Sequence, residues 1–216
     1  ISIPVLSRAW KEKDFSTISR IYKRSSLNLL LIAVFLFSLI WLNYDNAVDA
    51  LQLHNIYEQG KWVVFLLAIK NIVDMGTGVN AQIIGTSTYW RFDFFSGMIL
   101  LLLIVPLNII LVKQYGIIGS AWSALISYTV YNSIRLVFLK SKFNLHPFSE
   151  KTIKVLLHSA ACFILIYFLF KELNGWWGMI IRSVAYVALF IPTAIAFQLS
   201  PDIEPVMATI RKKLKL

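Results

Sequence analysis

Long apolar segments recur along the whole chain, about every 30 residues, and each is long enough to cross a lipid bilayer. A transmembrane β-barrel would instead need shorter segments of alternating polarity, and the sequence has none. Of the 216 residues, 58% are hydrophobic and only 15% are charged, which is too apolar for an ordinary soluble domain. The sequence therefore predicts an all-α polytopic membrane protein.

Six transmembrane helices are predicted, and they form one bundle over residues 25–199. The expected spans are 25–44, 60–84, 92–112, 120–139, 152–170 and 176–199. A basic amphipathic segment, residues 1–24, precedes the bundle, and a basic tail, residues 200–216, follows it. Because lysine and arginine concentrate in connections on one side, the positive-inside rule places both ends of the chain in the cytoplasm.

The formal net charge of +10 follows from these basic connections and ends. No nucleic-acid-binding motif accompanies the charge, so a nucleic-acid partner is not expected. In residues 1–24, aromatic side chains alternate with cations at roughly helical spacing, which suits a helix on the cytoplasmic membrane surface. Its cations would face anionic headgroups, so membrane lipids are expected partners.

The second span differs from the others because ionisable and polar side chains stand in its middle. With about 100° per residue, Lys70, Asp74 and Thr77 fall in one narrow stripe, with Asn71 along its border. A lysine and an aspartate one turn apart can neutralise each other. An ionisable residue at membrane depth is costly and by default marks a functional site facing a bundle interior or wet cavity. The candidate site residues here are Lys70, Asn71, Asp74, Thr77, Asn80 and Gln82.

Three other spans carry features of note. The fourth span has two ridges of small residues at four-residue intervals, typical of closely packed helices. These residues are Gly116, Ser120 and Ala124 on one ridge and Gly119, Ser123 and Ser127 on the other. Arg135, at the inner end of this span, can extend to the cytoplasmic surface. The sixth span holds Arg182 about two turns deep, and Ser149 is placed to cap the fifth.

Most enzyme chemistry is unsupported. The three histidines are far apart and there is one cysteine, so no metal site is expected. No phosphate-binding glycine loop and no nucleophile elbow is present, so no cofactor and no enzyme activity are expected. One enzyme alternative stays open: a membrane transferase that uses acidic and histidine side chains predicted in an outer segment. Those residues are Asp45, Asp49, His54 and Glu58.

Several short stretches in the first two thirds of the chain form a recognisable set. Near the start they are Ile-Pro-Val-Leu-Ser at 3–7, Lys-Glu-Lys-Asp-Phe at 11–15 and Ile-Tyr-Lys-Arg-Ser at 21–25. Further on they are Asn-Ala-Gln-Ile-Ile-Gly-Thr-Ser at 80–87, Asn-Ile-Ile-Leu at 108–111 and Tyr-Gly-Ile-Ile-Gly-Ser-Ala at 115–121. These stretches resemble the polysaccharide flippases of the MATE-like multidrug/oligosaccharidyl-lipid/polysaccharide exporter superfamily, except that Ser120 replaces the family's first alanine. The resemblance covers most of residues 1–150.

The resemblance implies the C-terminal lobe of a transporter in which two six-helix bundles face a central cavity with alternating access. The N-terminal half of the same polypeptide would then precede this chain. The implied substrate is a polyprenyl-diphosphate-linked oligosaccharide, flipped across the bacterial plasma (inner) membrane for cell-surface polysaccharide biosynthesis.

Within this implied transporter, Lys70 would attract the diphosphate, with Arg182 as a second cation nearer the outside. Neighbouring polar side chains would hydrogen-bond the sugar or the diphosphate. A cation-coupled small-molecule antiporter of the same superfamily is the alternative, with Asp74 binding Na⁺ or H⁺. A purely structural role, in which Lys70 and Asp74 only neutralise each other, also stays open.

Overall fold

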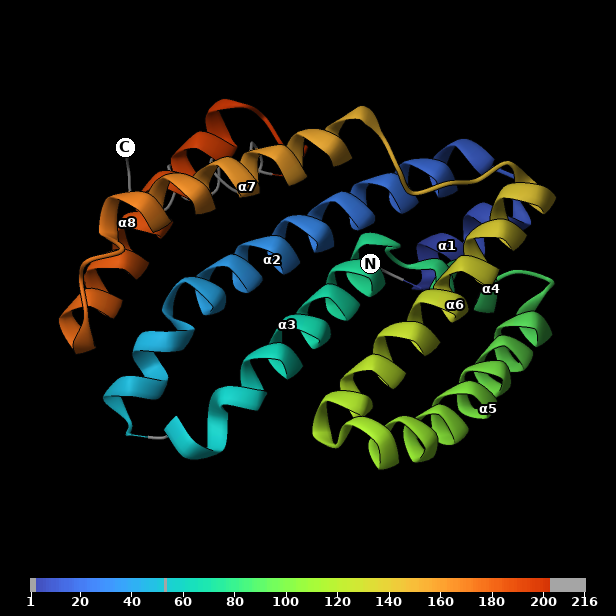
Figure 1. Cartoon of the computed structure of the whole chain (residues 1–216). Coiled ribbons are helices and arrows are strands. Elements are labelled where there is room, and N and C mark those ends of the chain that lie inside the picture. The colour runs from blue at the N-terminus through green and yellow to red at the C-terminus, as the bar shows by residue number, and fades with distance from the viewer. Residues whose placement is uncertain (1–2, 53, 203–216) are drawn as a thin grey trace. The chain divides into compact units, whose positions relative to one another are not determined.

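The computed structural model describes residues 3–52 and 54–202, and within these ranges it contains helices and no strands (Figure 1). The helices are α1 (Ile3–Lys11), α2 (Phe15–Ala50), α3 (His54–Gly76), α4 (Asn80–Gly85), α5 (Trp90–Tyr115), α6 (Ile117–Phe143), α7 (Glu150–Phe170) and α8 (Gly175–Ala196). They form two compact units: Ile1–Ala33 with His54–Phe148, and Val34–Leu53 with Ser149–Leu216. We call these the first and the second unit.

Four of the described helices, α2, α5, α7 and α8, are long and apolar enough to cross a membrane. This agrees with a multi-pass membrane protein. The second and fourth predicted spans correspond to α3 and α6, which have 23 and 27 residues. These two helices carry the polar residues singled out above, and that polarity lowers their mean hydropathy. Their place in the membrane, and with it the count of six spans, remains a prediction.

The N-terminal boundary differs from the predicted division at residue 24. Helix α1 ends at Lys11, and α2 begins at Phe15 and continues to Ala50. Asp45 and Asp49 therefore lie on the last turns of α2 and not in a segment separate from that helix. His54 and Glu58 belong to α3, but their side chains lie outside the described part of the chain.

Asp14 ends the turn between α1 and α2 by capping α2. Its Oδ1 atom accepts a hydrogen bond from the backbone N–H of Thr17 at 3.0 Å and from Ser16 Oγ at 2.7 Å. These are the contacts that an N-cap residue makes to otherwise unpaired helix N–H groups. Hydrogen bonds from Thr17 and then Ser16 favour the ionised form and lower the pKa of Asp14 to about 2.

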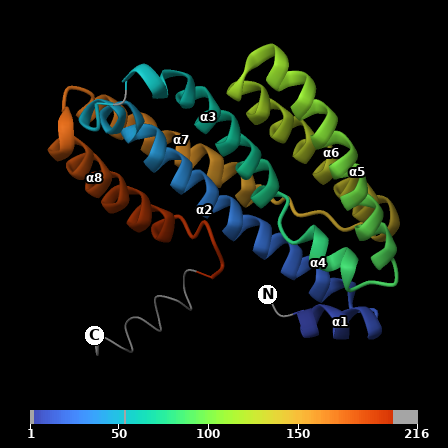
Figure 2. The same cartoon turned by 90° about the horizontal axis from the view of Figure 1, so that it is seen from below.

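Helix α1 packs on protein, although its sequence suits a membrane surface. Leu6 and Ala9 are buried, and Trp10 Nε1 donates to the carbonyl of Ile83 at 3.0 Å. Figure 2 shows α1 beside α4. The shared core of the first unit consists of Leu6, Ala9, Ile18, Tyr22, Val79, Ile83, Ile84, Leu139 and Leu145. Leu6, Ala9 and Trp10 of α1 thus pack on α4 and its neighbours, whereas Ile3 and Val5 are exposed.

Helices α5 and α6 form a tight antiparallel pair joined at Gly116 (Figure 1). Gly119, Ser123 and Ser127 are buried on α6, and Ser123 Oγ donates to the carbonyl of Ile104 on α5 at 3.0 Å. The other small-residue ridge is mostly open, since Gly116 and Ser120 are exposed and Ala124 is half-buried. Only one of the two ridges therefore lies within a helix contact of the first unit.

The second unit combines the C-terminal half of α2 with α7 and α8. Ser38 of α2 contacts Ser159 of α7 at 3.3 Å between hydroxyl oxygens, and Asn43 Nδ2 donates to Ser183 Oγ of α8 at 3.0 Å. The backbone N–H of Ser149 donates to Thr152 Oγ1 at 3.0 Å, half of a capping box that begins α7 as predicted.

Candidate functional site

The predicted second span is interrupted. Helix α3 ends at Gly76 and α4 begins at Asn80, so the expected continuous helix over 60–84 is wrong at this point. Gly78 has φ +70°, and a Cβ atom there would lie 3.0 Å from the Cα of Ser26 on α2. Ser26 Oγ donates to the freed carbonyl of Gly76. The close approach of α2 thus requires glycine and supplies a partner for the broken helix end.

Lys70 and Asp74 face each other one turn before this break. Lys70 Nζ lies 3.5 Å from Asp74 Oδ2 and 3.3 Å from Asn71 Oδ1. It also lies 3.6 Å from the centre of the Tyr128 ring, a cation–π contact. The Lys70 side chain is 15% exposed and that of Asp74 is 36% exposed, so the carboxylate is the more accessible partner.

Asn132 of α6 joins α6 to the broken helix. Its Nδ2 donates to Asp74 Oδ1 at 3.0 Å and to the carbonyl of Tyr128 at 3.0 Å. Its Oδ1 accepts from Thr77 Oγ1 and from Asn80 Nδ2, both at 3.0 Å. The amide therefore has two donor and two acceptor contacts, which is the full capacity of this group. Asn132 is 2% exposed, so these contacts are made away from water.

Arg135, one turn further along α6, extends the same network toward α5. Its guanidinium donates to Asn80 Oδ1 at 3.3 Å, to Ser96 Oγ at 3.0 Å and to the Asp93 carboxylate. It also lies 4.0 Å from the ring centre of Tyr131. The Arg135 side chain is 3% exposed, so the expectation that it extends to the cytoplasmic surface is wrong. A nearby carboxylate and amide satisfy the cation, and it has no need to reach water.

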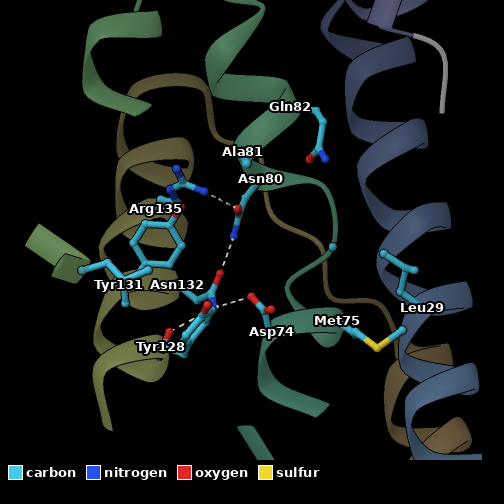
Figure 3. A pocket seen from close by; sticks show the side chains of 12 residues that line it. Leu29, Asp74, Met75, Asn80, Ala81, Gln82, Tyr128, Tyr131, Asn132 and Arg135 are labelled. Atoms are coloured by element: carbon cyan, nitrogen blue, oxygen red, sulfur yellow. Dashed lines mark hydrogen bonds between the residues drawn. The ribbon is translucent and has the colours of Figure 1, made fainter. Parts of the chain in front are cut away.

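A pocket of about 340 Å³ lies beside these groups, as Figure 3 shows. It is lined by Leu29, Asp74, Met75, Gly78, Asn80, Ala81, Gln82, Leu100, Tyr128, Tyr131, Asn132 and Arg135. Hydrogen-bonding groups and two aromatic rings thus converge on one cavity, which is the usual composition of a small-molecule site. We call the pocket together with the polar network the polar pocket.

The structure brings part of the predicted site together. Asp74 and Asn80 belong to both network and pocket, Thr77 belongs to the network, and Gln82 lines the pocket. Lys70 reaches the network through Asp74, whereas Asn71 is exposed and contacts Lys70.

Arg182 lies in the second unit and is not part of the polar pocket. Its guanidinium donates to the carbonyls of Leu42, Phe170 and Leu173. A role for Arg182 in binding the substrate remains a prediction.

The residues of the network and pocket that the sequence did not assign to the site lie on α5 and α6. They are Asp93, Ser96, Tyr128, Tyr131, Asn132 and Arg135. On α6 a usable signal existed, because Tyr128, Asn132 and Arg135 recur at spacings of four and three and so share one helix face. Among the described residues, no group of three histidine, cysteine, aspartate or glutamate side chains is placed to hold a metal ion.

The chain matches no protein-family model, and neither a curated protein nor a solved structure shows significant similarity to it. The geometry of the polar pocket is therefore the structural basis for a functional proposal.

Asn132→Asp is expected to make folding depend on pH. The new carboxylate would stand about 3 Å from Asp74 Oδ1, and two carboxylates that close cannot both be ionised. The folded variant must then hold a proton that an unfolded carboxylic acid releases near about pH 4. Its thermal stability should therefore fall, relative to the wild type, as the pH rises from about 5 to about 8.

The matched control for this variant is the exchange Asp74→Asn with Asn132→Asp, measured as thermal unfolding in detergent micelles. The exchange keeps one carboxylate in the pair and keeps an amide donor facing it, so its stability should follow the wild type across this pH range. A single Asn132→Asp variant with the pH profile of the wild type would show that Asn132 does not contact Asp74.

Proposed function

We propose that the first unit is the cargo-binding part of a membrane transporter that flips a polyprenyl-diphosphate-linked oligosaccharide. The observation that carries this proposal is the polar pocket itself: a network of acidic, basic and amide side chains beside a cavity at a broken helix, within a very apolar chain. In membrane transporters, interrupted helices and intramembrane charges commonly mark the substrate site. The resemblance to polysaccharide flippases supplies the class of cargo.

The two cations of the network differ in how readily they can bind an anion. Arg135 is held by the Asp93 carboxylate, Ser96 and Asn80 and is almost fully buried. Lys70 does not itself line the pocket, but it contacts Asp74 at 3.5 Å and its side chain is 15% exposed, against 3% for Arg135. A diphosphate therefore competes more easily for Lys70, as a point charge, than for Arg135. The amides and tyrosine rings of the pocket are suited to the hydroxyl-rich sugar.

The test measures export of the glycan by the full-length protein in cells. Lys70→Ala and Asp74→Ala are each expected to lower export by roughly tenfold or more, which corresponds to about 1.4 kcal/mol of lost interaction. Expression and membrane insertion should stay normal. Lys113→Ala, which removes an exposed lysine outside the polar pocket, is the matched control and should export normally.

A charge-neutral double variant separates function from simple neutralisation. If Lys70 and Asp74 only cancel each other's charge, Lys70→Met with Asp74→Asn should export as well as the wild type, because no unpaired charge remains. If Lys70 binds cargo, the double variant should stay as inactive as the single ones. Normal export by the double variant would remove the proposed role of the pair.

A cation-coupled small-molecule antiporter is the second candidate, and the Asp74 carboxylate favours it. Asp74 is 36% exposed, lines the pocket and lies two residues before the end of α3. In transporters, unwound backbone carbonyls at broken helices coordinate Na⁺, and carboxylates within the membrane accept protons. Drug susceptibility that follows expression of the protein, with surface glycan unchanged, would favour this candidate over the flippase.

A further inference from the structure

The C-terminal end of α6 and the start of α5 lie side by side. Their side chains are of the kinds found at a membrane surface. The rings of Phe92 and Phe138 stack with centroids 3.8 Å apart, and Tyr89 lies 5.7 Å from Phe143. Trp90 is 56% exposed, and the guanidinium of Arg91 lies 5.5 Å from its ring centre. Exposed tryptophan, tyrosine and arginine at the end of an apolar helix are typical of the lipid–water interface.

A second pocket, of about 410 Å³, opens at this end of α6 and is separate from the polar pocket. Its polar lining comes from Lys140, Asn144 and His146, and its apolar lining includes Leu136, Val137 and Phe148. Val137 is 67% exposed and Phe148 is 46% exposed. The pocket thus places an apolar wall and nitrogen donors side by side at the level of the interface. We call it the interfacial pocket.

The ionisable side chains that line the interfacial pocket are both basic. No acidic residue lines it, and within the described part of the chain neither Lys140 Nζ nor the His146 ring makes an ion pair or hydrogen bond. The C-terminal end of α6 is capped. Asn144 adopts the left-handed conformation, so its N–H and that of Leu145 donate to the carbonyls of Lys140 and Leu139 at 3.0 and 3.2 Å. These bonds offset part of the negative potential of the helix end, and the Lys140 side chain opposes the rest.

We propose that the interfacial pocket binds the headgroup of an anionic phospholipid from the surrounding bilayer. The phosphate would lie between Lys140 and His146, and the acyl chains would follow Val137 and Phe148 along α6. A basic pocket beside transmembrane helices is a known arrangement for recognition of anionic headgroups. The exposed apolar wall favours a lipid over a soluble phosphate, because only a lipid would cover that wall. The proposal requires that this chain lies in a membrane, but it does not depend on which cargo the polar pocket binds.

The test counts retained phosphatidylglycerol. The purified full-length protein is equilibrated with mixed micelles of phosphatidylcholine and phosphatidylglycerol, and bound lipids are counted by native mass spectrometry. Lys140→Gln with His146→Gln is expected to lower retention of phosphatidylglycerol by about tenfold, which is about 1.4 kcal/mol. Retention of phosphatidylcholine should not change.

Lys142→Gln is the matched control, because it removes the same charge two residues away, outside the interfacial pocket. Lys142 is exposed and lies 5.8 Å from the Tyr89 ring centre, so it shares the location but not the cavity. An equal loss of lipid in this control would show diffuse surface attraction and overturn the proposal. Displacement of phosphatidylglycerol by millimolar inorganic phosphate would also overturn it, in favour of a soluble anion. Neither result would bear on glycan export.

Discussion

Gly119→Ala is expected to destabilise the first unit by about 2–3 kcal/mol, the upper range for an overpacked contact. A Cβ atom at position 119 would lie 2.0 Å from the carbonyl oxygen of Leu111 and 2.8 Å from the backbone nitrogen of Val112. Both atoms belong to the backbone of α5, so neither can rotate away. The variant can relieve the clash only by moving α5 away from α6, which also breaks the hydrogen bond from Ser123 to Ile104.

Gly97→Ala is the matched control, because it adds the same methyl group to α5. A Cβ atom at position 97 meets nothing within 4 Å. Alanine also favours the helix over glycine by about 0.5–1 kcal/mol, so this variant should be at least as stable as the wild type. Both variants would be compared by thermal unfolding in detergent micelles. Equal stability of the two variants would show that α5 and α6 do not approach each other at Gly119.

Arg135→Met is expected to destabilise the first unit by about 3 kcal/mol, the lower range for removal of one partner of a buried ion pair. Methionine fills much of the same volume but leaves the Asp93 carboxylate unpaired, and Asn80 Oδ1 and Ser96 Oγ lose a donor. Asp93 is 34% exposed, so water reduces the cost of its unpaired charge and sets the expected value near this lower end. Asn80 also donates a hydrogen bond to Asn132. Removing the Arg135 contact to Asn80 should therefore also disturb the side chains that line the polar pocket.

Two further variants test the reason for this effect. Arg91→Met makes the same chemical change at an exposed arginine, and its stability should stay within about 0.5 kcal/mol of the wild type. Arg135→Lys keeps the charge but not the planar guanidinium, which reaches Asp93, Ser96 and Asn80 together. The stability of Arg135→Lys should therefore lie between those of Arg135→Met and Arg91→Met. If Arg135→Met unfolds at the wild-type temperature, Arg135 is not the buried, paired residue described above.

Sequence periodicity predicted the helices well where they are long and apolar. Helices α7 and α8 begin and end within about three residues of the spans 152–170 and 176–199. The pairing of Lys70 with Asp74 followed from their four-residue spacing, because neighbouring turns of one helix bring such side chains together whatever surrounds them. These properties are local: they depend on a helix and not on what it packs against.

The break between Gly76 and Asn80 was not predictable in this way. Residues 60–84 are apolar enough for one helix, and the interruption depends on Ser26 of α2, some fifty positions away, which contacts Gly78 and donates to Gly76. Arg135 was misplaced for a similar reason. A cation near a helix end normally extends to water, and only the packing of α5 on α6 brings Asp93 to it.

The sequence by itself determined that this is an all-helical chain with several segments suited to a membrane, and that Lys70 and Asp74 pair within one further apolar segment. It did so because hydropathy and helical period are properties of neighbouring residues. The tertiary structure alone decided which groups complete that charged segment: Asn132 against Asp74, and Arg135 with Asp93 at the far end of the same network. The buried groups among them, Asn132 and Arg135, must find their partners within the protein, and those partners come from helices that only folding brings together.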